Sequence, residues 1–449
     1  MRKVFSAHWF IILTLLMLSI FYISGVSKVP FHPDESTLIY MSADFENLFS
    51  DPLSMSWKAG DPIPDTVRYR MIDAPITRYL LGFGRSINKI TAPQVDWDWS
   101  ATWEENAIAG ALPDERLLLT ERLVIASFFP LTILLLYLIG LKFDGRSLGI
   151  LIVLLFSFNP LILLHTRRAM AEGVLVFGLV LTLYFMLNLE KYPFLVGLTA
   201  ALAFNAKHSA FVLIPIGLLA VCWPSFSNAR SFSRLFSNAF QYISGFILLT
   251  LLLNPFLWHN PATAAYKAFE QRRALLAKQQ ADFAEWFPGQ VLESPAERAT
   301  VMLAQIIIAP PIFAEVGNYL EYTRKTEIEY LQTPGNVVGR NFISGGLLLG
   351  SMFLGSLILI RRILKSRPGK HRDSTILLLS MAVLMVGHIL LIPLAWQRYT
   401  VPLIPFTSII AGIGLVWGIK NSRRIISHGS LSSRLSQILS QFSTDSRMP

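Results

Sequence analysis

Long apolar segments recur along the whole chain and decide what it can fold into. A helix needs about 20 apolar residues to cross a bilayer. We expect such spans near 8–27, 119–141, 147–165, 171–188, 238–258, 341–360, 374–396 and 400–419. Charged residues make up only 15% of the sequence, whereas soluble proteins carry about 25%. The sequence therefore predicts an all-α, polytopic integral membrane protein.

One further apolar run, 194–223, is interrupted by Asn205-Ala206-Lys207-His208. A single helix would bury Lys207 at its centre, which is costly in a membrane. Two shorter helices that turn at Lys207 avoid this cost. We therefore expect a hairpin here and about ten membrane helices in all.

Basic residues predict the orientation of the chain. Cytoplasmic loops carry an excess of Lys and Arg. With ten crossings, the six cations of 361–372 lie on the same side as Arg2, Lys3 and Lys420. One crossing fewer would place that loop outside, so we expect both termini to be cytoplasmic. The first span is either a cleaved signal peptide or, as we prefer, an uncleaved signal anchor.

Two long segments, 28–118 and 259–340, then face outward. The first holds 14 of the chain's 29 acidic residues. Both are expected to be partly helical, and Ser294 with Glu297 predicts a capping box. We treat residues 1–420 as one membrane domain. The Ser-rich segment 421–449 is a cytoplasmic tail, either frayed or containing a short amphipathic helix.

Charged residues gather at the expected outer ends of the spans. Asp34 and Glu35 follow the first span within the sequence FHPDEST. The other outer turns supply His165, Arg167, Arg168, Glu172, Lys207, His208, His259 and Arg398. Because cytoplasmic loops are the ones that collect cations, cations at outer turns indicate a polar site covered by the outer loops.

Simpler explanations exist for several of these residues. Asp34 and Glu35 would also suit a helix cap or a solvated loop. Arg167 and Arg168 would also reach lipid headgroups, and Glu172 would favour a helix N-terminus. Lys207 and Arg398 resist such explanations, since a cation within apolar segments is a functional hypothesis by default.

Together these charges indicate a reaction. A carboxylate can take a proton from an incoming hydroxyl or amine. Cations can hold a phosphate and stabilise the charge that develops as it leaves. The minimal interpretation is the transfer of a group from a lipid phosphate to an acceptor on the outer face.

Six segments resemble, in the same order, motifs of the C-superfamily (GT-C) glycosyltransferases and of their family 39. That group includes the protein O-mannosyltransferases and the bacterial aminoarabinose transferase. The segments are FHPDEST, IDAPITRYLLGFG, RLVIASFFPLTILLLYLIG, RRAMAEGVLVFG, ALAFNAKHSAFVLIPI and QRYTVPLIPFTSIIAGIGL, which together extend through most of 30–419.

The resemblance implies roles for single residues. Asp34 matches the catalytic base and Glu35 its motif partner. Glu172 matches the second acidic position, which is expected to position the acceptor or support the base. The resemblance thus implies that Asp34, Glu35 and Glu172 are the catalytic residues. The donor phosphate is expected to be bound by Arg168, Lys207 and Arg398, and we add His259 from its place at the end of a span.

The implied activity is transfer of a sugar, with inversion, from a polyprenyl-phosphate monosaccharide to a lipid, glycan or protein acceptor. We expect a protein of the cytoplasmic membrane with its active site outside. We expect no cofactor, no metal ion and no nucleic-acid partner.

Two other functions stay open at this point. A transporter or lipid flippase often contains repeated halves and broken helices near the midplane. The break at 205–208 fits that pattern, although no second copy of it is evident in the sequence. A non-enzymatic assembly factor of the cell envelope is the third interpretation.

Overall fold

Helices account for nearly all the regular structure of the protein. The structure is a computed structural model, and it describes residues 2–227, 232–314, 319–365 and 371–428. Over these ranges the only strand-like feature is an isolated antiparallel bridge between Val291 and Leu394. The predicted all-α fold is confirmed. Most of the predicted tail lies outside the described residues.

Apolar helices lie at every position where a span is expected. Among the residues that the structure describes, seven segments are long and apolar enough to cross a membrane: Trp9–Lys28, Glu115–Asp144, Ala171–Asn188, Phe232–Leu253, Phe342–Lys365, Arg372–Leu391 and Gln397–Ser422. Three shorter apolar helices lie at Arg146–Ser157, Pro193–Ala206 and His208–Pro224. The chain is a multi-pass membrane protein, and the count of ten crossings stays a prediction.

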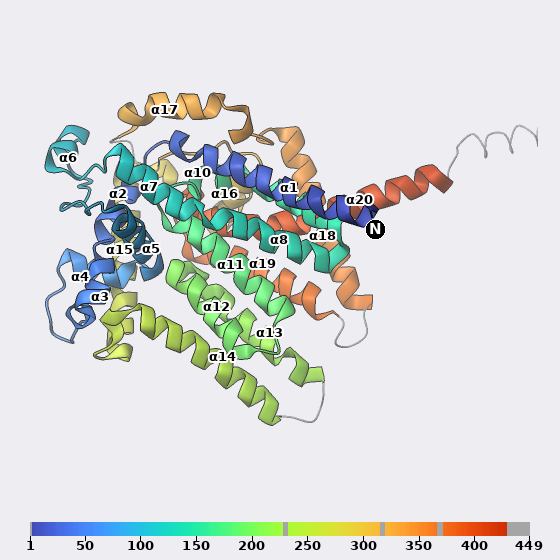
Figure 1. The fold of residues 1–449 in the computed structure, drawn as a ribbon, viewed down its shortest axis with the longest axis horizontal. Helices are drawn as coiled ribbons and strands as arrows, with labels where there is room; N and C mark the ends of the chain where they lie inside the picture. The colour runs from blue at the N-terminus through green and yellow to red at the C-terminus, as the bar shows by residue number, and fades with distance from the viewer. Residues whose placement is uncertain (1, 228–231, 315–318, 366–370, 429–449) are drawn as a thin grey trace, which may run out of the picture.

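The helices of the spans are named here, and all of them except α9 are labelled in Figure 1. They are α1 (Arg2–Ser24), α7 (Glu115–Ala126), α8 (Phe128–Asp144), α9 (Arg146–Ser157), α10 (Pro160–His165), α11 (Ala171–Asn188), α12 (Pro193–Ala206), α13 (Ile214–Ser227), α14 (Phe232–Leu253), α18 (Phe342–Lys365), α19 (Arg372–Leu391) and α20 (Ile404–His428). Short 3-10 helices η1 (Val26–Lys28), η3 (His208–Leu213), η4 (Pro255–Leu257) and η7 (Gln397–Leu403) flank them.

The expectation of one continuous helix over 147–165 is wrong. The helix α9 ends at Ser157, and α10 begins at Pro160. Proline has no backbone N–H to continue a helix, and the Asn159 side chain instead accepts from the N–H of Leu161 at 3.0 Å. The pair Asn159-Pro160 therefore ends one helix and starts the next.

The predicted turn at Lys207 is confirmed. The two legs on either side of Lys207 pack against α14 in opposite directions. Asn205 donates to Thr250 at 3.1 Å, whereas Val221, on the returning leg, accepts from Asn238 near the start of α14 at 2.9 Å. The chain thus runs along α14 as far as Lys207, reverses direction there and runs back along α14.

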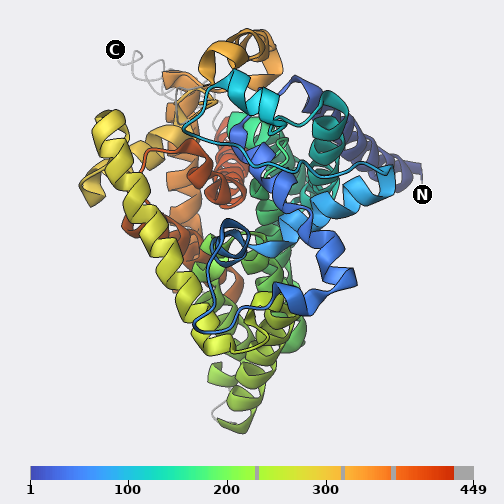
Figure 2. The ribbon, with the colours of Figure 1, turned by 90° about the vertical axis from the view of Figure 1, so that its left-hand side faces the viewer.

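The long segments between spans fold into helices at one end of the bundle, which we call the loop end (Figures 1 and 2). These are α2 (Pro33–Met41), α3 (Asp44–Ser50), η2 (Pro52–Met55), α4 (Asp65–Ile72), α5 (Pro75–Asn88), α6 (Trp103–Ala109) and α15 (Pro261–Trp286). They are followed by η5 (Pro288–Gln290), α16 (Pro295–Ile307), α17 (Leu320–Gln332) and η6 (Pro334–Asn336). The capping box at the start of α16 is confirmed. The chain enters α1 and leaves α20 at the opposite end (Figure 1).

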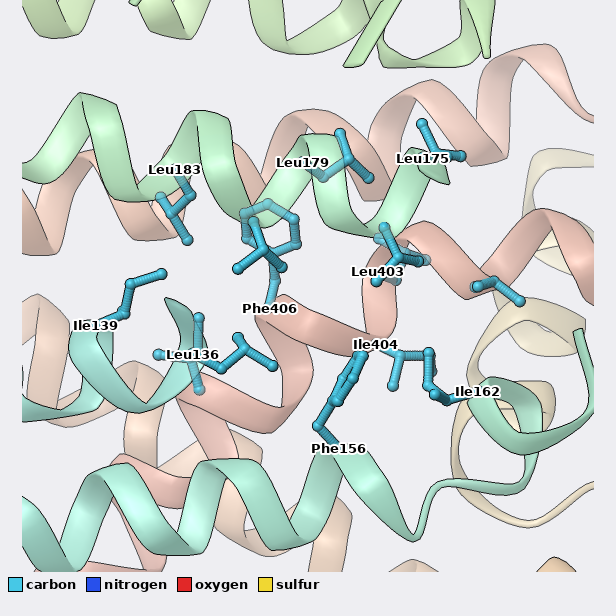
Figure 3. Packing of buried hydrophobic residues seen from close by; sticks show 14 of the residues in the cluster. Leu136, Ile139, Phe156, Ile162, Leu175, Leu179, Leu183, Leu403, Ile404 and Phe406 are labelled. Carbon is cyan, nitrogen blue, oxygen red and sulfur yellow. The ribbon is translucent and has the colours of Figure 1, made fainter. Parts of the chain in front are cut away.

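The apolar helices pack closely against one another and form a frame for the site. Figure 3 shows Leu136 of α8, Phe156 of α9, Leu179 of α11 and Phe406 of α20 packed together, and all four are buried. Small residues let backbones approach, as is common between membrane helices. A Cβ atom added at Gly355 of α18 would lie only 1.9 Å from a carbonyl oxygen of α20. This frame fixes the helix ends from which the site is built.

Candidate active site

The start of α2 orients Asp34 and Glu35 differently. Pro33 occupies the first helical turn, where its missing N–H costs nothing. The His32 side chain caps the helix by accepting from the N–H of Asp34 at 3.1 Å. Glu35 completes a capping box, because its Oε2 accepts from the N–H of His32 at 3.1 Å. The helix-cap interpretation is therefore correct for Glu35.

Glu35 is fully buried and fully paired. Arg122 of α7 donates to its two carboxylate oxygens at 2.7 Å each, and the N–H of Ala169 donates at 2.8 Å. Burial works to raise the pKa of Glu35, but the charge and hydrogen bonds of Arg122 outweigh it and lower that pKa. Glu35 thus joins α2, α7 and the segment before α11.

Asp34 faces a different partner. Its carboxylate forms an ion pair with the guanidinium of Arg398, in η7. The Asp34 side chain is 30% exposed and that of Arg398 is 11% exposed. The guanidinium also lies over the rings of Trp396, at 4.9 Å, and Tyr399, at 5.7 Å. The pair joins the first loop to the last span.

A second ion pair lies beside the first. Lys207 Nζ contacts Oε1 of Glu172, at the start of α11, at 2.5 Å. Its ammonium group also lies 5.2 Å from the ring of Tyr399. The second oxygen of Glu172, Oε2, is buried and has no hydrogen-bond partner within the part of the chain that the structure describes. The Tyr399 ring therefore contacts the cations of both pairs.

Both cations line one cavity, and the rest of its wall is largely apolar. Helices α11 and α19 and the short helices η3 and η7 form this wall. It consists of Leu175, Leu179, Lys207, Ser209, Ala210, Val212, Leu384, Gly387, His388, Leu391, Ile392, Arg398, Tyr399, Pro402 and Leu403. The cavity has a polarity suited to an amphipathic ligand, with positive charge held next to apolar surface.

Asp73, between α4 and α5, is a third carboxylate near Asp34 that the sequence analysis did not single out. Burial raises its pKa above the ordinary value, and the negative charge of Asp34 adds to that rise. The charges of Arg272 and Arg78 oppose it. Its only signal in the sequence is its position in the segment IDAPITRYLLGFG.

The sequence also did not identify Arg122 as the partner of Glu35. Arg122 lies at the start of a long apolar run, and a cation in that position needs a counter-charge. That expectation alone does not indicate which acid is its partner.

The structure does not bring two of the proposed phosphate-binding residues to the cavity. Arg168 is 1% exposed and donates to the carbonyl oxygens of Pro30 at 3.2 Å and Phe313 at 2.8 Å. His259 is exposed, in the turn between η4 and α15. Lipid-headgroup contact is the wrong explanation for Arg167 and Arg168, because both guanidinium groups are buried and bind groups inside the protein.

Known structures show the same arrangement of helices. ArnT from Cupriavidus metallidurans, solved with undecaprenyl phosphate, matches 94% of this chain and 64% of its own at 14% identity and a TM-score of 0.53. The oligosaccharyltransferase of Archaeoglobus fulgidus, tethered with an acceptor peptide, matches 94% of this chain and 51% of its own at 13% identity and a TM-score of 0.50. This chain has the GT-C fold.

The likeness concerns the fold alone, because the identities are low. The chain spans about half to two thirds of the length of these two GT-C structures. A scan against protein-family models finds no match, and a search of curated proteins finds none either. Within the described ranges of this GT-C fold, no three His, Cys, Asp or Glu side chains form a group suited to a metal ion. The expectation of no metal stays a prediction.

Proposed function

We propose that the protein is a glycosyltransferase that moves a sugar from a polyprenyl-phosphate monosaccharide to an acceptor on the outer face of the membrane. The observation that carries the proposal is the cavity at Lys207 and Arg398. It offers two cations beside an apolar wall, and one of those cations contacts Asp34. The loop end then faces outward, with both termini cytoplasmic.

The donor fits the cavity by its chemistry. A phosphate anion would bind the guanidinium of Arg398, whose planar fork matches phosphate oxygens, and the ammonium of Lys207. Isoprenoid units would lie against apolar residues such as Val212 and Leu384. The similar ArnT structure contains undecaprenyl phosphate, which supports this class of donor.

Donor binding would exchange the partners of both cations. Phosphate oxygens compete with Asp34 for Arg398 and with Glu172 for Lys207. Release from Arg398 leaves the carboxylate of Asp34 available to accept a proton. In this way the arrival of the donor would prepare the base.

The reaction is a single displacement. The acceptor hydroxyl or amine attacks the anomeric carbon, and Asp34 takes its proton. The bond between the anomeric carbon and the phosphate oxygen breaks, and polyprenyl phosphate leaves with the electron pair. Lys207 and Arg398 stabilise its negative charge. One displacement inverts the anomeric configuration.

Several residues would act as positioning residues. Before the donor arrives, Glu172 holds Lys207 at the cavity through their 2.5 Å contact. Glu35 and Arg168 both bind the segment that leads to Asp34, the first through the N–H of His32 and the second through the carbonyl of Pro30. His259 would contribute least, because it is solvent-exposed in its turn.

Donor binding tests this function. Affinity for a radiolabelled polyprenyl-phosphate monosaccharide is measured on the purified protein in lipid nanodiscs, for the wild type, Arg398→Ala and Lys207→Ala. Arg361→Ala, an exposed cation at the end of α18, is the matched control. Loss of affinity in the first two variants alone supports the proposal. Equal affinity in all four proteins contradicts it.

A further inference from the structure

An aromatic cluster lies beside the candidate active site at the loop end. Three separate segments contribute to it: the residues before α2, the segment that leads into α6, and the start of α17. The cluster consists of Phe31, His32, Trp97, Trp99, Trp103, Tyr319 and Tyr322.

The rings extend from the protein interior to its surface. Trp97 lies 6.0 Å from Phe31 and 5.8 Å from Trp103, measured between ring centroids. Trp103 stacks on Tyr322 at 4.9 Å with an angle of 6° between the ring planes. Trp97 is 3% exposed, whereas Trp99 is 42% and Tyr322 is 45% exposed. The cluster therefore has a buried base and an accessible outer part.

His32 connects the cluster to Asp34. The His32 ring centroid lies 5.9 Å from that of Tyr319 and 6.4 Å from that of Trp99. Its Nδ1 atom lies 3.9 Å from Oδ1 of Asp34. A single side chain thus separates the exposed Trp99 from the proposed general base. A ligand lying on the outer rings would be next to the reacting group.

Polar atoms surround the exposed rings. Oε1 of Glu104 accepts from the Tyr322 hydroxyl at 2.5 Å, and Oδ1 of Asp98 accepts from the Ser100 hydroxyl at 2.6 Å. The Trp97 indole N–H is buried without an acceptor within the described ranges. The cluster thus combines flat rings with carboxylates that accept from hydroxyls and with one unused donor.

We propose that this aromatic cluster binds a sugar ring of the acceptor, so that the acceptor is a carbohydrate. The inference rests on the proposed function. The face of an aromatic ring is negative and its edge positive. The polarised C–H groups on one face of a pyranose are attracted to the ring face, and the sugar hydroxyls can donate to the nearby carboxylates.

An aromatic belt at the membrane interface explains this cluster less well. Rings of such a belt face lipid from separate helices, whereas these rings pack on one another. The helix α6 also lies beyond the start of α7, away from the spans (Figure 1). The acidic residues Asp98 and Glu104 beside the exposed rings suit an aqueous ligand better than a lipid chain.

Binding of oligosaccharides to the whole protein in nanodiscs tests the inference. The probes are cellotetraose, maltotetraose and chitotetraose, with a serine- and threonine-containing decapeptide as the competing acceptor class. Ligand-detected NMR and intrinsic tryptophan fluorescence measure binding to the wild type, Trp99→Ala and Trp286→Ala. Trp286, 70% exposed at the end of α15, is the matched control.

We expect saturable binding of at least one sugar, weakened about tenfold or more in Trp99→Ala, as for removal of an aromatic anchor. Trp286→Ala should bind like the wild type. A second variant, Tyr322→Phe, keeps the stacking but removes the hydroxyl that bonds to Glu104, and it should retain most of the affinity. Saturable binding of the peptide alone, binding of no probe, or unchanged sugar affinity in Trp99→Ala would each overturn the inference.

Release of sugar from the donor, with water as acceptor, distinguishes a failure of the carbohydrate-acceptor inference from a failure of the proposed function. Wild-type protein that hydrolyses donor but binds no oligosaccharide retains the proposed function and loses the carbohydrate acceptor. Protein that binds oligosaccharide at Trp99 but neither binds nor hydrolyses donor retains the aromatic subsite and loses the proposed function.

Discussion

Two adjacent carboxylates, Asp34 and Glu35, belong to two different regions of the molecule. Glu35 forms a buried anchor with Arg122 and the N–H of Ala169, and its side chain is 0% exposed. Asp34 belongs to a cavity site with Arg398, and its side chain is 30% exposed.

The difference shows that two neighbouring carboxylates can have separate roles. Glu35 stabilises the structure, and Asp34 is available for the reaction. Every oxygen of Glu35 has a fixed donor inside the protein, so it cannot exchange partners without loss of the fold. Asp34 is partly open to solvent and pairs with a cation that lines a cavity. A residue that is partly open to solvent, as Asp34 is, can change partners during a reaction cycle.

The largest expected effect follows from Asp34→Asn. The amide cannot accept the acceptor proton, and turnover should fall by about 10²–10⁴-fold, the usual contribution of a general base. Thermal stability should stay close to that of the wild type, because the side chain is partly exposed. Transfer or hydrolysis of labelled donor measures the first effect, and a thermal unfolding curve in detergent measures the second.

Asp282→Asn, at an exposed acid near the C-terminal end of α15, is the matched control for this prediction. Asp34→Asn protein that unfolds at a much lower temperature would place Asp34 in the same structural class as Glu35.

Arg122→Ala should have the opposite profile. Removing one partner of a buried ion pair leaves an uncompensated charge and costs about 3–5 kcal/mol. The stability of the protein should fall by that amount, and activity should follow the amount of folded protein. Specific activity per folded molecule close to that of the wild type would confirm the anchor. Stability that is unchanged would contradict it.

Low pH should weaken the same buried ion pair between Glu35 and Arg122. Because Arg122 lowers the pKa of Glu35 below its ordinary 4.5, this stabilisation is present above pH 4.5 and is lost as pH falls through the lowered value. Unfolding temperatures measured from pH 7 downward should show this loss in the wild type. A parallel loss in Arg122→Ala would show that another group is responsible.

Substitution of Arg398 tests the cavity site with a smaller effect. A hydrogen bond to a charged group contributes about 1.5–3 kcal/mol, so Arg398→Ala should raise the donor KM by about 10–100-fold. Arg398→Lys keeps the charge but loses the planar fork. Its donor KM should therefore lie between those of the wild type and Arg398→Ala. Equal KM values for all three proteins would remove Arg398 from donor binding.

The smallest effect is expected for His259→Ala. Surface substitutions away from a site usually change free energies by less than about 0.5 kcal/mol, so donor KM should change by less than about threefold. Kinetics with the labelled donor measure it. A change as large as that of Arg398→Ala would bring His259 back into the phosphate site.

Hydropathy and charge predicted the helices and the turn at Lys207, because burying a lysine in lipid has a large local cost. The break at Asn159-Pro160 was missed, because the apolar run continues on both sides of it. Local patterns determine where a helix lies, but a break that keeps the hydropathy high leaves a weak signal.

The pairing of charges could not be predicted from sequence spacing. Glu35 and Arg122 lie 87 positions apart, and Asp34 and Arg398 lie 364 positions apart. Adjacent residues such as Asp34 and Glu35, or Arg167 and Arg168, have the same composition around them. Only the fold determines which of them faces a cavity and which binds a backbone carbonyl.

The most direct test of the central claim is sugar release from radiolabelled polyprenyl-phosphate monosaccharides by purified protein in lipid, comparing the wild type with Asp34→Asn. We expect release by the wild type, slow if water is the only acceptor, and a loss of about 100-fold or more in the variant. Equal release by both proteins, or movement of the intact donor across the bilayer without release, would contradict it.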